Sequence, residues 1–158
     1  MRRKPLDQMV CSIGKALDVI GDPWTMLVVR DALLGVTRFD DFSARLGIPR
    51  ATLVARLQLL CARGVLERHR YQEHPPRDEY TLTEMGRALR PVLVTLMQWG
   101  DEWMRTDTPP TQLIDATDGR RLDPVLVDRD TGTPLADLPV RAVGRVADGI
   151  RATTSRSL

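Results

Sequence analysis

The sequence predicts a mainly α-helical α+β fold that contains one β-hairpin and ends in a small β-rich appendage. Over the first two thirds of the chain, apolar residues recur at the spacing of amphipathic helices. The segment RYQEHPPRDEYTLTEMG, at 70–86, instead predicts a strand, a stiff turn with two prolines, a second strand and a helix start. After residue 111, short apolar runs are separated by Asp-Gly and Thr-Gly turns, which indicates two or three further short strands.

The composition is that of a globular protein. Its 158 residues are 42% hydrophobic and 28% charged, which suits one domain with an appendage. No window approaches the roughly 18 continuous apolar residues of a membrane span, and the basic N-terminus lacks the apolar stretch of a secretory signal. We therefore expect a cytoplasmic protein without membrane contact.

The sequence contains no motif typical of catalysis or metal binding. It has no glycine-rich phosphate loop, no GxSxG motif and no HExxH motif. Cys11 and Cys61 form no CxxC pair, and neither His69 nor His74 is spaced with a cysteine as a metal ligand. We therefore expect no enzyme, no metal site and no cofactor.

The first two helices are predicted on either side of a Gly-Asp-Pro break. Apolar residues at helical spacing extend from Met9 to Ile20. Pro23 suits the first turn of the next helix, with Asp22 as its N-cap. The strongly apolar stretch 24–34 should be buried nearly all round, and Gly35 ends it.

A short helix, a tight glycine turn and a longer helix follow. Phe39, Phe42 and Leu46 share one face of the short helix, which ends at Gly47. Pro49 then begins a helix that lasts until the glycine at position 64. The inner face of this longer helix carries Leu53, Leu57 and Leu60. This order of elements predicts a helix-turn-helix.

The hairpin after the second of these helices is predicted to be a wing. Pro75 and Pro76 fix two φ angles and remove two N–H donors, so they belong at its tip. Arg68 and Arg70 share one face of its first strand. On a wing, these arginines would contact DNA phosphates or the minor groove. The alternative is a solvated hairpin that covers the core, and the preceding helix-turn-helix favours the wing.

The chain beyond the hairpin predicts one long helix and then a second region. Thr83 can cap a helix over Glu84–Met104, in which Pro91 should cause a bend. The expected domains are a DNA-binding and dimerisation domain at 9–105, a linker at 106–111, a β-rich extension at 112–150 and a frayed tail at 151–158.

Basic residues are almost all arginine and gather in one region. The net charge is only +2, but among 23 Lys and Arg residues only Lys4 and Lys15 are lysines. From Arg38 to Arg77, eight arginines face four carboxylates. A guanidinium fits phosphate and guanine, so this local excess is what DNA binding would produce. Codon composition is an equally good explanation for the arginine total.

Five motifs carry a resemblance to a known family. They span Cys11–Trp24 (CxxxxxLxxIGxxW), Arg38–Phe42 (RFxxF), Gly47–Leu57 (GIxxxxLxxRL), Gly64–Arg68 (GVLxR) and Pro75–Gly86 (PPRxEYxLTxxG). On these motifs the chain resembles the HxlR branch of MarR-like winged-helix transcriptional regulators, over about residues 11–103. The resemblance implies a homodimer that binds pseudo-palindromic double-stranded DNA, often beside its own promoter.

The predicted DNA contacts come from the helix-turn-helix and the wing. They are Arg38, Arg50, Ala51, Thr52, Ala55, Arg56, Arg68, Arg70, His74 and Arg77. The N-terminal half of a recognition helix normally enters the major groove, and Arg56 is the preferred base-reading candidate. A phosphate contact or an internal salt bridge is the alternative for Arg56. Arg38 is expected on phosphate, or paired with Asp40 or Asp41.

The resemblance also implies dimer contacts by the first and last helices. The predicted interface residues are Met9, Ile13, Leu17, Leu89, Val92, Leu93, Leu96, Trp99 and Trp103. The apolar stripe of the last helix is wider than one small domain can cover. Trp24, together with the two tryptophans of that helix, could instead line a pocket for a small-molecule effector. Core or interface packing is the more common role of such residues.

Cys11 matches the position of a cysteine that senses oxidants or electrophiles in several relatives. Helix N-termini favour the reactive thiolate, and the alternative is a packed thiol at the dimer interface. Ser12 replaces the proline that usually follows this cysteine, and Pro49 replaces the usual serine cap. Cys61 is expected to be an inert apolar residue.

The sequence therefore predicts a dimeric DNA-binding regulator. A repressor is the preferred role over an activator. It would respond to oxidants or electrophiles through Cys11. The alternatives are a regulator with a ligand pocket at the dimer interface, and a ligand- or protein-interaction module that has kept the fold without DNA binding. The extension lacks the paired cysteines of some extended relatives, so no metal is expected there.

Overall fold

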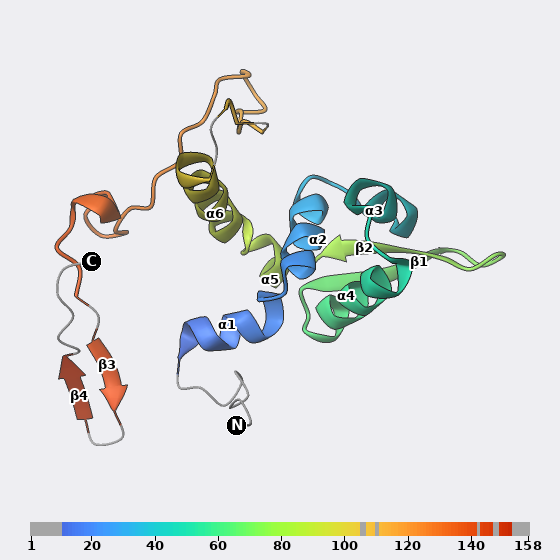
Figure 1. Ribbon diagram of the computed structural model, residues 1–158, viewed down its shortest axis with the longest axis horizontal. Coiled ribbons are helices and arrows are strands. Elements are labelled where there is room, and N and C mark those ends of the chain that lie inside the picture. The colour runs from blue at the N-terminus through green and yellow to red at the C-terminus, as the bar shows by residue number, and fades with distance from the viewer. Residues whose placement is uncertain (1–10, 105–106, 110, 142, 147–148, 153–158) are drawn as a thin grey trace. The chain divides into compact units, whose positions relative to one another are not determined.

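The computed structural model describes residues 11–104, 107–109, 111–141, 143–146 and 149–152. The chain divides into two compact units, Met1–Thr106 and Asp107–Leu158, and the division lies at the start of the predicted linker. The first unit contains, in order, α1 (Ser12–Ile20), α2 (Pro23–Leu33), α3 (Phe39–Leu46), α4 (Arg50–Ala62), β1 (Leu66–Gln72), β2 (Arg77–Leu82), α5 (Glu84–Arg87) and α6 (Arg90–Trp103). This is the predicted winged helix-turn-helix (Figure 1).

The helix boundaries follow from the capping residues in the sequence. The Asp22 carboxylate accepts a hydrogen bond from the Thr25 backbone N–H at 3.1 Å, and Pro23 occupies the first turn of α2. Gly47 ends α3 in the left-handed conformation, with φ of 61°, which only glycine adopts without strain. The chain therefore turns sharply between α3 and α4, as a helix-turn-helix requires.

One hydrophobic core holds the first unit together. Leu53, Leu57 and Leu60 of α4 are at most 1% exposed, which confirms the inner face that their spacing predicted. They pack with the fully buried Phe42 of α3 and Val28 of α2. Burial of each such side chain contributes about 1.5–3 kcal/mol to folding, so the core fixes α4 against α2 and α3.

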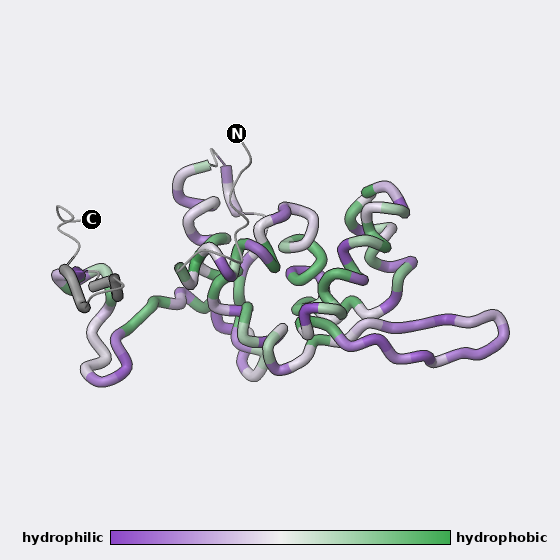
Figure 2. Tube along the Cα trace, turned by 90° about the horizontal axis from the view of Figure 1, so that it is seen from below, coloured by the Kyte–Doolittle hydropathy of each residue, from purple (hydrophilic) through white to green (hydrophobic). Residues whose placement is uncertain are grey.

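The hairpin is anchored at its base and free at its tip. β1 and β2 pair antiparallel, with Leu66 opposite Leu82 and Arg70 opposite Asp78. Within β2, the Tyr80 N–H donates to the Thr37 carbonyl at 2.7 Å, so the segment before α3 pairs with the second strand. The tip extends past the helices (Figure 1) and is hydrophilic along most of its length (Figure 2).

The prediction of one bent helix over 84–104 is wrong. The chain forms two helices, α5 and α6, because proline cannot donate to the preceding turn and instead suits the first turn of a new helix. The Thr83 hydroxyl caps α5 as predicted, since it accepts from the Gly86 N–H at 3.1 Å. Gly86 itself is buried, and a Cβ there would overlap the carbonyl oxygen of Val65.

The second unit contains short β-structure, as predicted. β3 (Val143–Val146) and β4 (Gly149–Ala152) pair antiparallel, and η2 (Leu135–Asp137) is a single 3₁₀ turn. Before them lie two isolated β-bridges, Ile114 with Arg121 and Val127 with Pro134. Strand β4 includes the first two residues of the predicted frayed tail, and 153–158 lie outside the described residues.

Candidate nucleic-acid interface

Three arginines from distant parts of the sequence meet in one groove. The groove lies between α3, the N-terminal half of α4 and the hairpin, and encloses about 410 Å³. Arg38 precedes α3, Arg50 begins α4 and Arg77 begins β2, and all three line it. The structure therefore brings together three of the residues predicted to bind DNA.

Two of these arginines are held by aromatic rings. The Arg38 guanidinium carbon lies 4.9 Å from the centre of the Tyr71 ring, and that of Arg50 lies 4.4 Å from the centre of the Phe39 ring. A stacked guanidinium is fixed by its face, and its N–H edge remains available to phosphate or a base. Sequence reasoning did not assign Phe39 or Tyr71 to the site, because stacking partners are not marked by spacing along the chain.

Carboxylates also line this groove. Asp40 and Asp41 from the first turn of α3, and Asp78 from β2, lie beside the three arginines. In the described part of the chain, no ion pair joins Arg38 to Asp40 or Asp41 within 4.0 Å. The opposite charges nearly balance, so attraction of DNA must depend on close, directed contacts rather than on a broad positive field.

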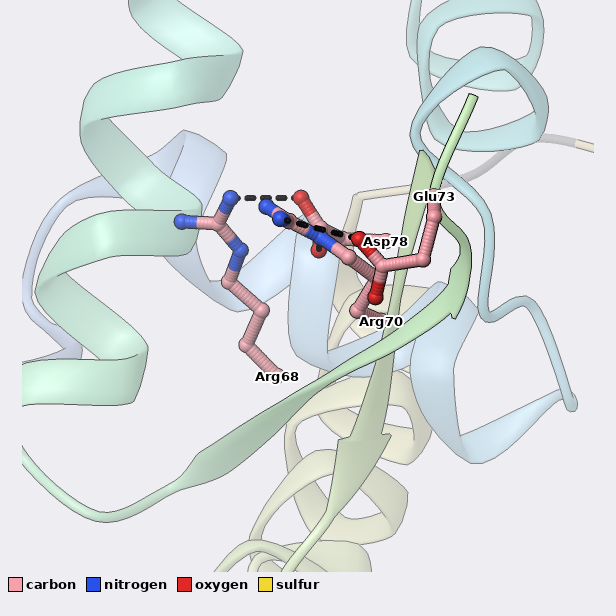
Figure 3. Close-up of polar contacts among 4 residues, drawn as sticks. All are labelled: Arg68, Arg70, Glu73 and Asp78. Carbon is pink, nitrogen blue, oxygen red and sulfur yellow. Dashed lines mark hydrogen bonds and ion pairs between the residues drawn. The ribbon is translucent and has the colours of Figure 1, made fainter. Parts of the chain in front are cut away.

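The wing arginines are already paired within the protein. Arg68 Nη2 donates to Asp78 Oδ2 at 2.5 Å, and Arg70 Nε donates to Asp78 Oδ1 at 3.2 Å (Figure 3). Arg70 also pairs with Glu73 at 3.7 Å. The hydrogen bond from Arg68 is the main reason that the pKa of Asp78 lies below its ordinary value.

The hairpin is not basic in sum, which differs from the prediction. Between Leu66 and Leu82 lie three arginines and four carboxylates. The sequence window that indicated a basic region ended at Arg77, directly before Asp78 and Glu79. Asp78 is therefore the functional candidate that sequence reasoning missed, and the signal that could have found it is its position opposite Arg70 in the hairpin.

Arg56 lies in the internal salt bridge that the sequence left open as an alternative. Its Nη1 is 3.5 Å from Asp22 Oδ2, and its side chain is only 27% exposed. At the far end of α4, Arg63 Nη2 pairs with Asp18 Oδ2 at 2.7 Å. These two ion pairs connect the recognition helix to α1, through Asp18, and to the N-cap of α2, through Asp22.

The remaining predicted contacts lie on the accessible side of the unit. Ala51 and Ala55 are exposed on α4, Thr52 is half-buried, and His74 is exposed at the hairpin tip. The N-terminal half of α4 therefore presents small side chains beside Arg50.

The predicted interface residues divide into two groups. Six are 44–70% exposed in the single chain: Ile13, Leu17, Val92, Leu96, Trp99 and Trp103. Leu89 and Leu93 instead pack against the core, and Met9 lies outside the described residues. The described part of α6 contains no buried residue, so this helix leaves an apolar face exposed in the single chain.

The two cysteines differ in environment. Cys11 is exposed at the N-cap of α1, and its side chain makes no capping hydrogen bond. Cys61 is half-buried beside the leucine face of α4, and burial raises the pKa of its thiol. Neither belongs to a metal cluster, because no group of three potential ligands exists among the described residues. No helix in the described ranges has the length and apolar character needed to cross a membrane.

Comparison with known proteins identifies the family. The model of the HxlR-like helix-turn-helix family matches residues 19–108. The chain belongs to the HxlR-like helix-turn-helix family. Rv3095 of Mycobacterium tuberculosis, an HTH-type transcriptional regulator of uncharacterised role, is 46% identical over 117 residues, which are 73% of this chain and 74% of the relative. The chain is therefore an HTH-type transcriptional regulator, as its sequence predicts, and its family consists of regulators rather than enzymes.

Solved structures extend the similarity of this HxlR-like regulator beyond the winged helix. PA1607, a candidate transcription factor, has a TM-score of 0.75 and 35% identity, over 94% of this chain and 98% of its own. The similarity therefore includes most of the C-terminal unit. The oxidised form of the redox regulator HypR has a TM-score of 0.55 and 33% identity, over 62% of this chain and all of its own.

Proposed function

We propose that this HxlR-like regulator represses transcription by binding a pseudo-palindromic operator as a homodimer. The observation that carries the proposal is the groove in which Arg38, Arg50 and Arg77 meet beside the exposed start of α4. With α4 in the major groove, Arg50 lies nearest the base edges. Arg38 and Arg77 would bind phosphates on either side and set the position of the helix on the duplex.

The exposed apolar faces of α1 and α6 support a dimer. A two-fold dimer uses the same patch on both subunits, and Leu96 and Trp99 provide such a patch on α6. Two recognition helices would then contact half-sites about one helical turn apart. A repressor of this kind acts by occupying a promoter, and a change at the dimer interface alters the spacing of its two α4 helices.

The first experiment is recovery of DNA fragments bound by the full-length protein from a genomic library. We expect fragments that share an inverted repeat, and a sedimentation coefficient of a dimer at micromolar concentration. Titration of one recovered fragment and of a random duplex at several salt concentrations then measures specificity. Equal affinity for both duplexes at every salt concentration, or a monomer that binds single half-sites, would contradict the proposal.

A response to oxidants through Cys11 forms a second part of the proposal. Cys11 is exposed at the start of α1, two residues before the exposed Ile13, and HypR is described as a redox regulator in oxidised and reduced forms. A diazene oxidant such as diamide would take two electrons and two protons from two Cys11 thiols of different subunits. The two sulfur atoms would then form a disulfide. This bond requires their Cα atoms within about 7 Å.

The test of Cys11 compares operator binding with and without diamide, in the wild type and in Cys11→Ser. We expect diamide to change the affinity of the wild type and to leave the variant unaffected. Cys61→Ser is the matched control, because Cys61 is half-buried in α4 and should not alter the response. If the wild type and Cys11→Ser respond alike, Cys11 is not the sensor.

A further inference from the structure

Asp78 occupies a central position between two sets of arginines. Its side chain, 15% exposed, accepts hydrogen bonds from Arg68 and Arg70 on the opposite strand. It also lines the groove that contains Arg77 and Arg50. The side chains of Arg68 and Arg70 remain 52% and 43% exposed, so each keeps N–H donors that solvent can reach.

We propose that Asp78 is a positioning residue that holds Arg68 and Arg70 in a neutralised state and thereby sets the discrimination between operator and random DNA. This inference rests on the proposed operator binding and names a specificity determinant within that same site. It concerns a carboxylate, a residue type that would itself repel DNA.

The physical reason lies in how binding to random DNA arises. Non-specific affinity comes almost entirely from cations that neutralise phosphates and release counterions. Two unpaired wing arginines would add this attraction on every duplex. Asp78, together with Glu73, cancels the charge of Arg68 and Arg70, so a distant phosphate gains little from them.

An operator can still use the paired arginines. Asp78 orients the two guanidinium groups on one face of the hairpin, and this orientation costs no further entropy when DNA arrives. Their solvent-facing donors reach a phosphate only when α4 is seated in its correct register. The carboxylate therefore weakens attraction at long range and preserves directed contact at short range.

The experiment compares Asp78→Asn with Glu67→Gln in the full-length protein. Glu67 is exposed on the same hairpin, and its only ion pair among the described residues is with His69, so the control changes the net charge equally without releasing an arginine. Each variant is titrated with an operator fragment recovered by the wild type and with a random duplex of the same length, over several salt concentrations.

For Asp78→Asn we expect the affinity for the random duplex to rise by about tenfold. The slope of log affinity against log salt concentration should steepen by about 1–2, because one or two more phosphates are neutralised. Operator affinity should rise less, so the ratio of specific to random affinity falls. Glu67→Gln should leave this ratio and the salt slope close to those of the wild type.

Two further variants separate this role from a structural one. Asp78→Thr removes the same charge with a residue that suits a strand, and it should reproduce the changes seen with asparagine. Asp78→Glu keeps the charge and should retain the specificity ratio of the wild type. Identical effects of Asp78→Asn and Glu67→Gln, or a flatter salt slope in Asp78→Asn and Asp78→Thr, would overturn the inference. If the wild type bound no duplex specifically, the proposed function would fail instead.

Discussion

Replacement of Arg56 distinguishes a base-reading residue from a structural one. The Arg56 side chain is 27% exposed and pairs with Asp22 at 3.5 Å, and Asp22 also caps α2. Arg56→Ala removes the ion pair, which contributes about 0.2–1 kcal/mol for a partly exposed pair. It also removes Cγ and Cδ, the two methylenes of the mostly buried side chain that alanine lacks, and each contributes about 0.8 kcal/mol. We expect the free energy of unfolding to fall by about 2–2.5 kcal/mol.

Arg56→Met separates the stem from the charge. Methionine keeps most of the apolar contact, and it removes the Arg56 Nε, which is buried without a hydrogen-bond partner in the described part of the chain. Its expected cost is therefore below about 1 kcal/mol. Arg63→Ala is the matched control, since Arg63 pairs with Asp18 at the opposite end of α4.

Urea denaturation measures the stability of each variant, and titration with operator and random duplexes measures specificity. A structural Arg56 predicts that the ratio of the two affinities is unchanged in Arg56→Met. A bidentate contact to guanine would instead contribute about 1–3 kcal/mol of discrimination, a factor of about 5–150. Loss of specificity of this size in Arg56→Met, with unchanged stability, would refute the assignment to the internal salt bridge.

Three further changes test the groove, the α5 contact and the dimer face. Arg77→Ala should weaken binding to operator and random DNA alike and reduce the salt slope by about 0.9, as expected for one lost phosphate contact. If the variant has the affinity and the salt slope of the wild type, Arg77 does not belong to the interface. Gly86→Ala should lower the free energy of unfolding, measured by urea denaturation, by at least about 1–3 kcal/mol, because the new Cβ would overlap the Val65 carbonyl oxygen. Wild-type stability in this variant would show that the backbone shifts to remove the overlap at no cost. Leu96→Asp should convert a dimer to a monomer in sedimentation, whereas Leu34→Asp, at a more exposed leucine that follows α2 as its C-cap, should not; a dimer in both would place the interface elsewhere.

Local signals in the sequence predicted most of the helices and the core. Asp22 and Gly47 mark helix ends because a side-chain cap and a left-handed turn involve only neighbouring residues. The leucines of α4 are buried because their spacing places them on one face. The helix break before Pro91 was predicted only as a bend, because whether a proline bends or ends a helix depends on how the adjoining turns pack.

The roles of the arginines were decided by the tertiary structure. Arg38, Arg56 and Arg68 are chemically alike in the sequence, and each was predicted to contact DNA. In the folded chain, one stacks on an aromatic ring, one pairs with the cap of α2, and one pairs with the opposite strand of the hairpin. The charge that an arginine offers to DNA depends on which groups lie within about 4 Å of it. Those neighbours are separated along the chain by as many as 34 residues, so only strand register and helix packing bring them together.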